Sequence, residues 1–170
     1  MSDAPIFQPR ELVERLTKAG VRFVLIGGLA AQAHGSPSAT FDLDIVPTWD
    51  SANLAKLADV LRDIAAVRHG LPSGSPTMPP LDTQTLRAAA VFTLNTRFGR
   101  LDVLAYPDPG FTCEHLMRSA EPRELFGVRL HVAGLDDLMA MKRAAGRPKD
   151  RVELEILGAL REEIDRRPGK

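Results

Sequence analysis

The sequence predicts a single domain of the α+β (α/β) class, built from short strands that alternate with helices. The chain has 170 residues, of which 44% are hydrophobic and 26% charged. This is enough for one cored domain and too little for two of typical size. Some segments place apolar residues at helical spacing, and others are short β-branched runs. No internal repeat or linker divides them, so we expect one domain over residues 1–170.

The first third of the chain is predicted to fold as helix, strand and helix. Residues 10–16 have helical spacing and follow Pro9, which suits the first turn of a helix. Residues 21–26 form a short β-branched run, which predicts a strand. Gly27-Gly28 then provides a turn, and residues 29–33 are good helix formers.

The next segments follow a break at residues 34–38, where glycine and proline occur. Residues 41–46 alternate acidic and hydrophobic side chains, which predicts a half-buried strand, and Pro47 should end its pairing. Residues 51–66 have helical spacing. Residues 70–80 are rich in proline, glycine and serine and should form a loop.

The second half is predicted to hold two further sheet regions and two helices. Residues 92–96 and 101–105 read as strands joined by a tight hairpin, and more strand pairing is expected around 125–132. Residues 134–145 and 148–166 have helical patterns. We therefore expect a core from about residue 21 to 132, followed by C-terminal helices.

Charge and composition limit the classes of partner. The chain has 22 basic and 22 acidic residues and a net charge of zero, which indicates no large nucleic-acid or membrane footprint. The single cysteine, Cys113, excludes an internal disulfide framework and fits a reducing compartment. The N-terminus lacks the pattern of a signal peptide, and no apolar run is long enough to cross a bilayer. We expect a cytoplasmic protein with no membrane partner.

Three aspartates are the strongest candidates for chemistry. Residues two apart on a strand project from the same face, so Asp42 and Asp44 should present their carboxylates together while Leu43 points into the core. Asp102 lies in a neighbouring predicted strand, again between apolar residues. Aspartate is depleted in strands. This conflict between propensity and position favours a functional site over a solvated strand face.

Three carboxylates near one point repel each other unless a cation neutralises them. Oxygen ligands of this kind suit Mg²⁺, and also Mn²⁺. A pair of such ions activates an attacking oxygen and stabilises the leaving phosphate oxygens, which is the chemistry of phosphoryl and nucleotidyl transfer. We therefore expect a hydroxyl to attack the α-phosphorus of a nucleoside triphosphate (NTP), with pyrophosphate leaving.

The Gly27-Gly28 pair is a candidate phosphate cradle. No side chain obstructs an approaching anion there, and amides at a helix start face it. Two glycines at a strand-to-helix turn are more often a steric necessity than a ligand site. Their combination with the three acids favours the ligand site.

These features together resemble the DNA polymerase β-like nucleotidyltransferase superfamily. The residues that carry the resemblance are Gly27-Gly28, His34-Gly35, Thr40-Phe41-Asp42-Leu43-Asp44 and Asp102. Within that superfamily, the chain is most similar to small bacterial proteins of the minimal nucleotidyltransferase and AbiEii/AbiGii toxin type. The similarity covers roughly Val21 to Asp150.

The resemblance implies a nucleotidyltransferase fold with a mixed central sheet flanked by helices. It implies a magnesium-dependent enzyme that moves a nucleotide from an NTP to a hydroxyl of RNA such as tRNA, of a protein or of a small molecule. Membership of a toxin-antitoxin system, with a cognate toxin or antitoxin as partner, is also implied. By the resemblance, Gly27 and Gly28 contact phosphate, Asp42 and Asp44 bind metal, and Asp102 binds metal and helps to deprotonate the acceptor.

The resemblance also extends to Lys142 and Asp150, and this chain departs from many relatives at Ser38. Lys142 and Asp150 match a basic and acidic pair of toxin-like relatives, in which the lysine touches the nucleotide, and we assign both to nucleotide binding. Many relatives place arginine or lysine where this chain has Ser38. Lost charge there would weaken a triphosphate or acceptor contact, and the candidates to replace it are Arg22, Arg97 and Arg100.

Two competing interpretations stay open. One is a catalytically degenerate module that acts by binding protein or nucleotide, with Ser38 as its first sign of decay. The other is a metal-dependent phosphoesterase built on the same acids. His34, which precedes a turn glycine, is more typical of a helix end than of a catalyst.

Overall fold

The computed structural model describes residues 5–71 and 79–168. The strands within these ranges are β1 (Phe23–Ile26), β2 (Asp42–Pro47), β3 (Val67–Arg68), β4 (Val91–Thr96), β5 (Gly99–Leu104), β6 (Glu121–Leu125) and β7 (Val128–Val132). The helices are α1 (Pro9–Lys18), α2 (Gly27–Ala33), α3 (Ser51–Asp63), α4 (Thr83–Arg87), α5 (Cys113–Met117), α6 (Leu135–Ala145) and α7 (Pro148–Arg166).

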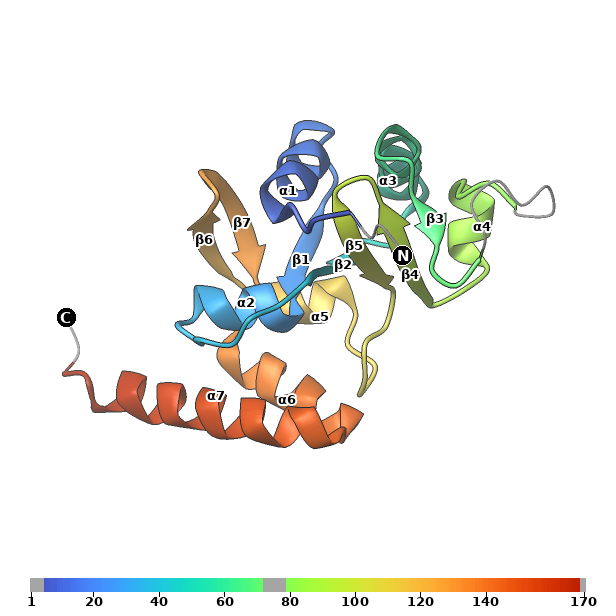
Figure 1. Ribbon diagram of the computed structural model, residues 1–170. Helices are drawn as coiled ribbons and strands as arrows, with labels where there is room; N and C mark the ends of the chain where they lie inside the picture. Colours follow the sequence, from blue (N-terminus) through green and yellow to red (C-terminus); the bar gives the residue numbers. More distant parts are fainter. Residues whose placement is uncertain (1–4, 72–78, 169–170) are drawn as a thin grey trace.

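The strands of the described residues form one seven-stranded sheet in the order β3-β4-β5-β2-β1-β7-β6. β1 pairs with β7 in parallel, as does β2 with β5, while the other neighbours are antiparallel. Figure 1 shows α1 and α3 toward one end of the strands and α2, α6 and α7 toward the other, with α7 outermost. The predicted mixed sheet flanked by helices is confirmed.

The first strand and its partner differ slightly from the prediction. β1 begins at Phe23 rather than Val21, because its pairing with β2 starts where Phe23 faces Pro47. Pro47 was predicted to end the pairing before it, but is itself the last residue of β2. A proline is accommodated at a strand end, where the missing N–H donor removes little of the ladder.

The Gly27-Gly28 pair is part of α2 rather than a separate turn, because α2 begins at Gly27 directly after β1. The predicted helix 51–66 is too long by one turn: α3 ends at Asp63, and Ala65 has a φ of +52°, which reverses the chain into β3. The predicted loop at residues 70–80 falls partly on residues 72–78, which lie outside the described residues.

Two short helices, the two-residue strand β3 and most of β6 were not predicted. α4 and α5 each begin after a side-chain cap: Asp82 accepts a hydrogen bond from the Thr85 amide, and Thr112 accepts one from the His115 amide. β6 lies at the sheet edge and is rich in charge, so it lacks the apolar alternation of a strand. The pairing expected around residues 125–132 is the hairpin of β6 with β7, which starts earlier, at Glu121.

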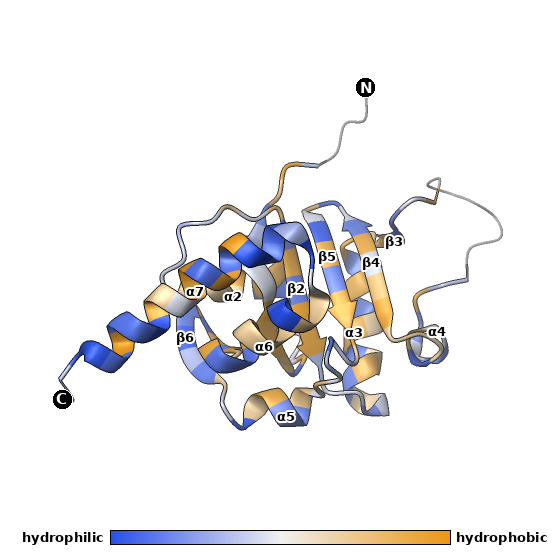
Figure 2. Ribbon diagram, turned by 90° about the horizontal axis from the view of Figure 1, so that it is seen from below, coloured by the Kyte–Doolittle hydropathy of each residue, from blue (hydrophilic) through white to orange (hydrophobic). Residues whose placement is uncertain are grey.

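The core lies on both sides of the central strands. All four residues of β1 are buried, and β5 alternates inward-facing and outward-facing residues. Figure 2 shows this alternation as orange and blue bands along β5. The hairpin of β4 with β5 and the helices α6 and α7 agree with the prediction. None of the described helices is long and apolar enough to cross a bilayer.

Candidate active site

The three predicted aspartates converge at one edge of the central strands. β2 and β5 are parallel neighbours, and their register pairs Asp44 directly with Asp102. Asp42 lies two residues before Asp44 and therefore on the same face of β2. One carboxylate oxygen of each residue lies within 4.8 Å of those of the other two. The strand register thus produces a cluster of three acids, which we call the carboxylate trio.

Burial and mutual repulsion make this trio electrostatically unfavourable without a counter-charge. Burial, followed by the charges of Asp42 and Asp102, raises the pKa of Asp44 to about 7. Burial also raises the pKa of Asp102, although Arg100 opposes the shift. Among the described residues, Asp102 Oδ1 is buried without a hydrogen-bond partner, and Arg100 Nε lies 3.8 Å from it, beyond hydrogen-bond distance. A carboxylate oxygen without a hydrogen bond, beside two further carboxylates, fits a divalent cation with oxygen preference, such as Mg²⁺ or Mn²⁺.

The raised pKa of Asp44 predicts a pH-dependent stability of the metal-free protein. Because the folded-state pKa of about 7 exceeds the unfolded value of 3.8, the contribution of this group is complete below the unfolded pKa and is lost as the pH rises through about 7. We expect the melting temperature of EDTA-treated wild type, relative to Asp44→Asn, to fall between pH 5 and 8. The stabilisation by Mg²⁺ should grow over the same interval. Parallel melting curves for the two proteins would contradict this.

Thr40 orients one member of the trio. Its hydroxyl donates a hydrogen bond of 2.9 Å to Asp42 Oδ1. Its side chain also packs against Gly28, where an added Cβ would lie 2.7 Å from both Thr40 Cβ and Thr40 Oγ1. Contacts of this kind hold a ligating carboxylate in one rotamer. Sequence reasoning assigned no role to Thr40, because only the fold shows which carboxylate oxygen its hydroxyl reaches.

We expect Thr40→Val, which keeps the volume and removes the hydroxyl, to weaken Mn²⁺ binding by about 10- to 100-fold. Thr40→Ser, which keeps the hydroxyl, should retain near wild-type affinity. Calorimetric titration of Mn²⁺ into the three proteins measures this directly. If valine and serine behave alike, the hydrogen bond to Asp42 does not position the ligand.

The two glycines lie on the wall next to the trio. Gly27 has a φ of +70°, and a Cβ there would lie 2.1 Å from Asp44 Oδ2. Neither position can therefore carry a side chain unless Asp44 or Thr40 moves. Packing alone accounts for both glycines, and the same lack of side chains keeps this wall open toward a ligand.

The trio and the glycines share one cavity of about 660 Å³. Its volume lies within the range of small-ligand sites. Residues of the sheet strands and residues of the C-terminal helices α6 and α7 both line it. The residues that line it are Ile26, Gly27, Gly28, Ser38, Ala39, Thr40, Asp42, Asp44, Val91, Asp102, Leu104, Pro107, Asp108, Leu138, Met141, Lys142, Ala145, Arg147, Lys149 and Glu153.

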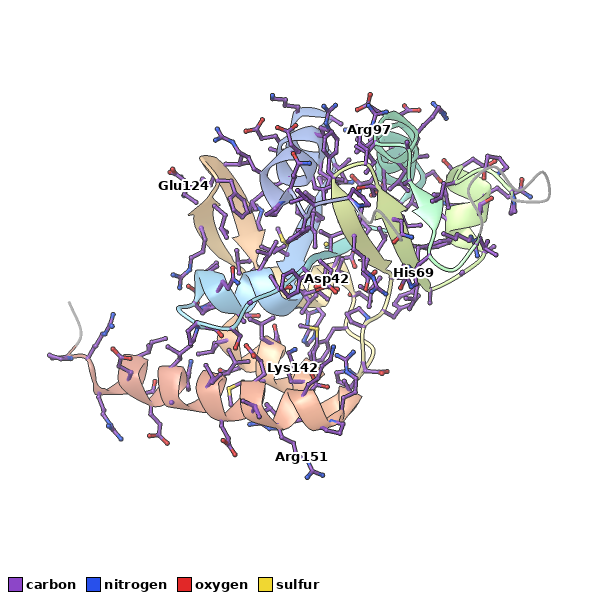
Figure 3. The ribbon with its side chains drawn as sticks, in the orientation of Figure 1. Asp42, His69, Arg97, Glu124, Lys142 and Arg151 are labelled. Atoms are coloured by element: carbon purple, nitrogen blue, oxygen red, sulfur yellow. The ribbon has the colours of Figure 1, made fainter. Side chains whose placement is uncertain are left out.

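Lys142 and Asp150, the basic and acidic residues predicted to bind the nucleotide, lie close together, but their side chains differ in exposure. Lys142 lines the cavity, and its Nζ lies 3.3 Å from Asp150 Oδ1. Asp150 has a side chain only 1% exposed and does not line the cavity. In Figure 3, Lys142 lies between Asp42 and α7. Asp150 is therefore buried next to Lys142 and is not part of the cavity surface.

Ser38 does lie on the cavity wall, but the three arginines considered as replacements for a basic residue do not. Arg22 pairs with Asp50 at 2.6 Å, and Arg97 lies at the upper edge of the molecule in Figure 3, whereas Asp42 lies near its middle. Arg100 Nε lies 3.8 Å from Asp102 Oδ1, beside the trio. The positive charge in the cavity comes instead from Lys142, Arg147 and Lys149. Arg147 and Lys149 follow a helix break, where sequence spacing gives no direction to a side chain.

His34 caps α2 and does not line the cavity. Its Nε2 lies 2.8 Å from the carbonyl oxygen of Ala133, and its ring is 8% exposed. Arg123 contacts its other ring nitrogen at 3.4 Å. These contacts tie α2 to the segment between β7 and α6.

The mixed sheet flanked by helices matches the fold of solved nucleotidyltransferases. A Thermotoga maritima protein assigned to the nucleotidyltransferases (TM1012) matches with a TM-score of 0.55 and 16% identity, covering 98% of this chain and 100% of its own. The lincosamide antibiotic adenylyltransferase LnuA, in its lincomycin-bound form, matches with a TM-score of 0.59 and 14% identity, covering 92% and 99%.

A further match is ANT(2'')-Ia in complex with adenylyl-2''-tobramycin, with a TM-score of 0.55 and 12% identity over 92% of this chain and 96% of that one. At these identities the similarity is one of fold. No protein-family model matches the sequence, and no curated protein matches it.

Proposed function

We propose that this protein is a magnesium-dependent nucleotidyltransferase that moves a nucleotide from an NTP to a hydroxyl acceptor. The observation that carries the proposal is the trio of Asp42, Asp44 and Asp102, with oxygens within 4.8 Å of each other, on the wall of a cavity that also holds Gly27 and Gly28. The shared fold with antibiotic adenylyltransferases supports it. An acidic cluster beside a side-chain-free wall and cationic side chains suits a metal-bound triphosphate.

Each residue then has a defined task. Asp42, Asp44 and Asp102 would hold Mg²⁺, which supplies charge neutralisation for the triphosphate and lowers the pKa of a bound hydroxyl. Gly27 and Gly28 leave room for the phosphates on the adjoining wall. The acceptor oxygen forms a bond to the α-phosphorus, the bond from that phosphorus to the bridging oxygen breaks, and pyrophosphate leaves.

We assign to Asp102 the role of receiving the acceptor proton. Because its pKa is raised, Asp102 accepts a proton more readily than an ordinary aspartate does. Its Oδ1 accepts no hydrogen bond from the described residues and has only Arg100 Nε near it, at 3.8 Å, so we assign the proton to this oxygen. The cavity wall next to it carries Val91, Leu104 and Pro107, and we assign this apolar wall to the acceptor.

For the acceptor, the observations favour a small molecule over RNA or protein. LnuA was solved with lincomycin bound and ANT(2'')-Ia with adenylyl-2''-tobramycin, so the same fold serves small acceptors in those proteins. The net charge of zero supports the same choice, because RNA recognition requires a larger positive surface. The resemblance to AbiEii-type toxins suggests a second candidate function, in which the acceptor is tRNA and the protein acts with an antitoxin.

The test is incorporation of label from each [α-³²P]NTP, supplied singly with Mg²⁺, into hydroxyl-bearing small molecules, total tRNA and cell protein. We expect labelled acceptor and pyrophosphate in equal amounts. Release of phosphate without incorporation would instead identify a phosphoesterase. Absence of both incorporation and NTP binding would refute nucleotidyl transfer. Growth arrest on expression, relieved by a neighbouring gene product, would identify the toxin arrangement.

A further inference from the structure

The corner between α6 and α7 contains a pair of cations attached to one buried acid. Asp150 accepts hydrogen bonds from Lys142 Nζ at 3.3 Å and from Arg147 Nε at 2.8 Å. Its side chain is 1% exposed. A buried carboxylate is costly unless it is paired, so it fixes the position of whichever cations neutralise it.

We propose that Arg147 binds the triphosphate of the nucleotide donor, and that Asp150 is a positioning residue that holds Arg147 and Lys142 side by side for this purpose. The proposal rests on the proposed function and deepens it, because it names the part of the site that selects a triphosphate. It also changes the predicted task of Asp150 from contact with the nucleotide to support of the two residues that make the contact.

The exposure of Lys142, Arg147 and Asp150 indicates which of them can contact phosphate and which can only support the others. Lys142 and Arg147 line the cavity with side chains 20% and 56% exposed, whereas Asp150 does not line it. A carboxylate would repel phosphate oxygens. Arg147 uses Nε and one terminal nitrogen on Asp150, which leaves further N–H donors. A guanidinium can therefore pair with the acid and still bind phosphate.

The local backbone holds this pair in place. Gly146 ends α6 in the left-handed conformation with a φ of +62°. Arg147 is the N-cap of α7, and its backbone amide donates to Asp150 Oδ2 at 3.1 Å. Pro148 follows as the first helical residue, where its fixed φ suits the turn. The guanidinium thus projects from a backbone that is constrained on both sides.

Electrostatic influence connects this corner with the carboxylate trio across the cavity. The hydrogen bond with Asp150 is the main cause that raises the pKa of Arg147, and the charges of Asp44 and Asp42 contribute. Burial opposes ionisation of Asp150, but hydrogen bonds from Arg147 and the charge of Lys142 hold its pKa below the usual value. Arg147 and Asp150 therefore both carry their charges near neutral pH. A triphosphate bound at the trio would extend through the same cavity toward Lys142 and Arg147.

The decisive variant is Arg147→Gln, with Arg151→Gln as its matched control. Arg151 lies four residues further along α7, is exposed and points away from the cavity in Figure 3. The probes are α,β-methylene-ATP, AMP and inorganic tripolyphosphate, each titrated with Mg²⁺ in a calorimeter. We expect Arg147→Gln to weaken both triphosphate probes by about 10- to 100-fold, the range for charge-assisted hydrogen bonds. AMP affinity should not change, and Arg151→Gln should match wild type.

The positioning task of Asp150 is tested by Asp150→Asn and by its combination with Arg147→Gln. If Asp150 acts through Arg147, the loss of triphosphate affinity in the double variant should be smaller than the product of the two single losses. The KM for NTP should rise in Asp150→Asn with little change in kcat, whereas general loss of structure would lower kcat and the melting temperature together. Circular dichroism and melting curves confirm that each variant is folded.

The outcomes separate this proposal from the proposed function. Nucleotide binding by wild type with unchanged triphosphate affinity in Arg147→Gln overturns the proposal alone. Multiplicative losses in the double variant overturn the positioning of Arg147 by Asp150. Failure of wild type to bind either triphosphate probe overturns both the proposal and the proposed function.

Discussion

Replacement of Asp42 by asparagine is expected to reduce nucleotide transfer by about 1,000-fold or more, with little change in the fold. Asparagine keeps the shape of the side chain but removes the negative charge that a divalent cation requires. Loss of one group that stabilises developing charge costs about 100- to 1,000-fold, and loss of a metal ligand removes several such contributions together. Asp44→Asn and Asp102→Asn should have effects of similar size.

The measurement is the rate of label transfer from [α-³²P]NTP, accompanied by thermal stabilisation with Mg²⁺. Asp136→Asn is the control, because Asp136 is exposed on α6 and does not line the cavity. We expect the control to transfer nucleotide at the wild-type rate. If the Asp42 variant retains the biological phenotype in full, the protein is a catalytically degenerate binding module.

Gly27→Ala is the second substitution for which we expect a large effect. The new Cβ would lie 2.1 Å from Asp44 Oδ2, and residue 27 has a φ of +70°, which disfavours alanine. Asp44 must move away, so Mg²⁺ affinity and transfer should fall by about 100-fold or more. Backbone strain should also cost about 1–3 kcal/mol of stability.

Gly127→Ala separates these two effects. Gly127 has a similar φ of +76°, but nothing lies within 4 Å of an added Cβ. The control should therefore lose stability through strain while it keeps Mg²⁺ affinity and transfer. Equal loss of Mg²⁺ affinity in both variants would mean that the close contact between Gly27 and Asp44 has no part in the site.

The parts of the fold that the sequence predicts are those with local signals. The alternation of Asp42 and Asp44 around Leu43 marks a half-buried strand, and Gly134 and Pro148 mark the starts of α6 and α7. The short helices α4 and α5 were missed, although Asp82 provides a capping signal for the first of them. With five residues each, they are too brief for helical periodicity to show.

Only part of the candidate site could be predicted from the sequence. The spacing of Asp42 and Asp44 indicates their common face, but the register that pairs Asp44 with Asp102 is a property of the sheet. The contact between Lys142 and Asp150 joins α6 to α7 and depends on the turn between the two helices. Nonlocal geometry of this kind leaves no periodicity in the sequence. Of the arginines named from the sequence, only Arg100 lies near the trio, at 3.8 Å from Asp102, and the sequence did not indicate that Arg147 and Lys149 line the cavity.

We propose above all that the carboxylate trio binds divalent cations next to a triphosphate. A crystal structure with Mn²⁺ and α,β-methylene-ATP tests it most directly, because anomalous scattering locates the metal independently of the ligand. We predict manganese bound to Asp42, Asp44 and Asp102, with the triphosphate extending along Gly27 and Gly28. Manganese at another site, or a triphosphate bound away from these carboxylates, would show that the trio is not the metal and nucleotide site.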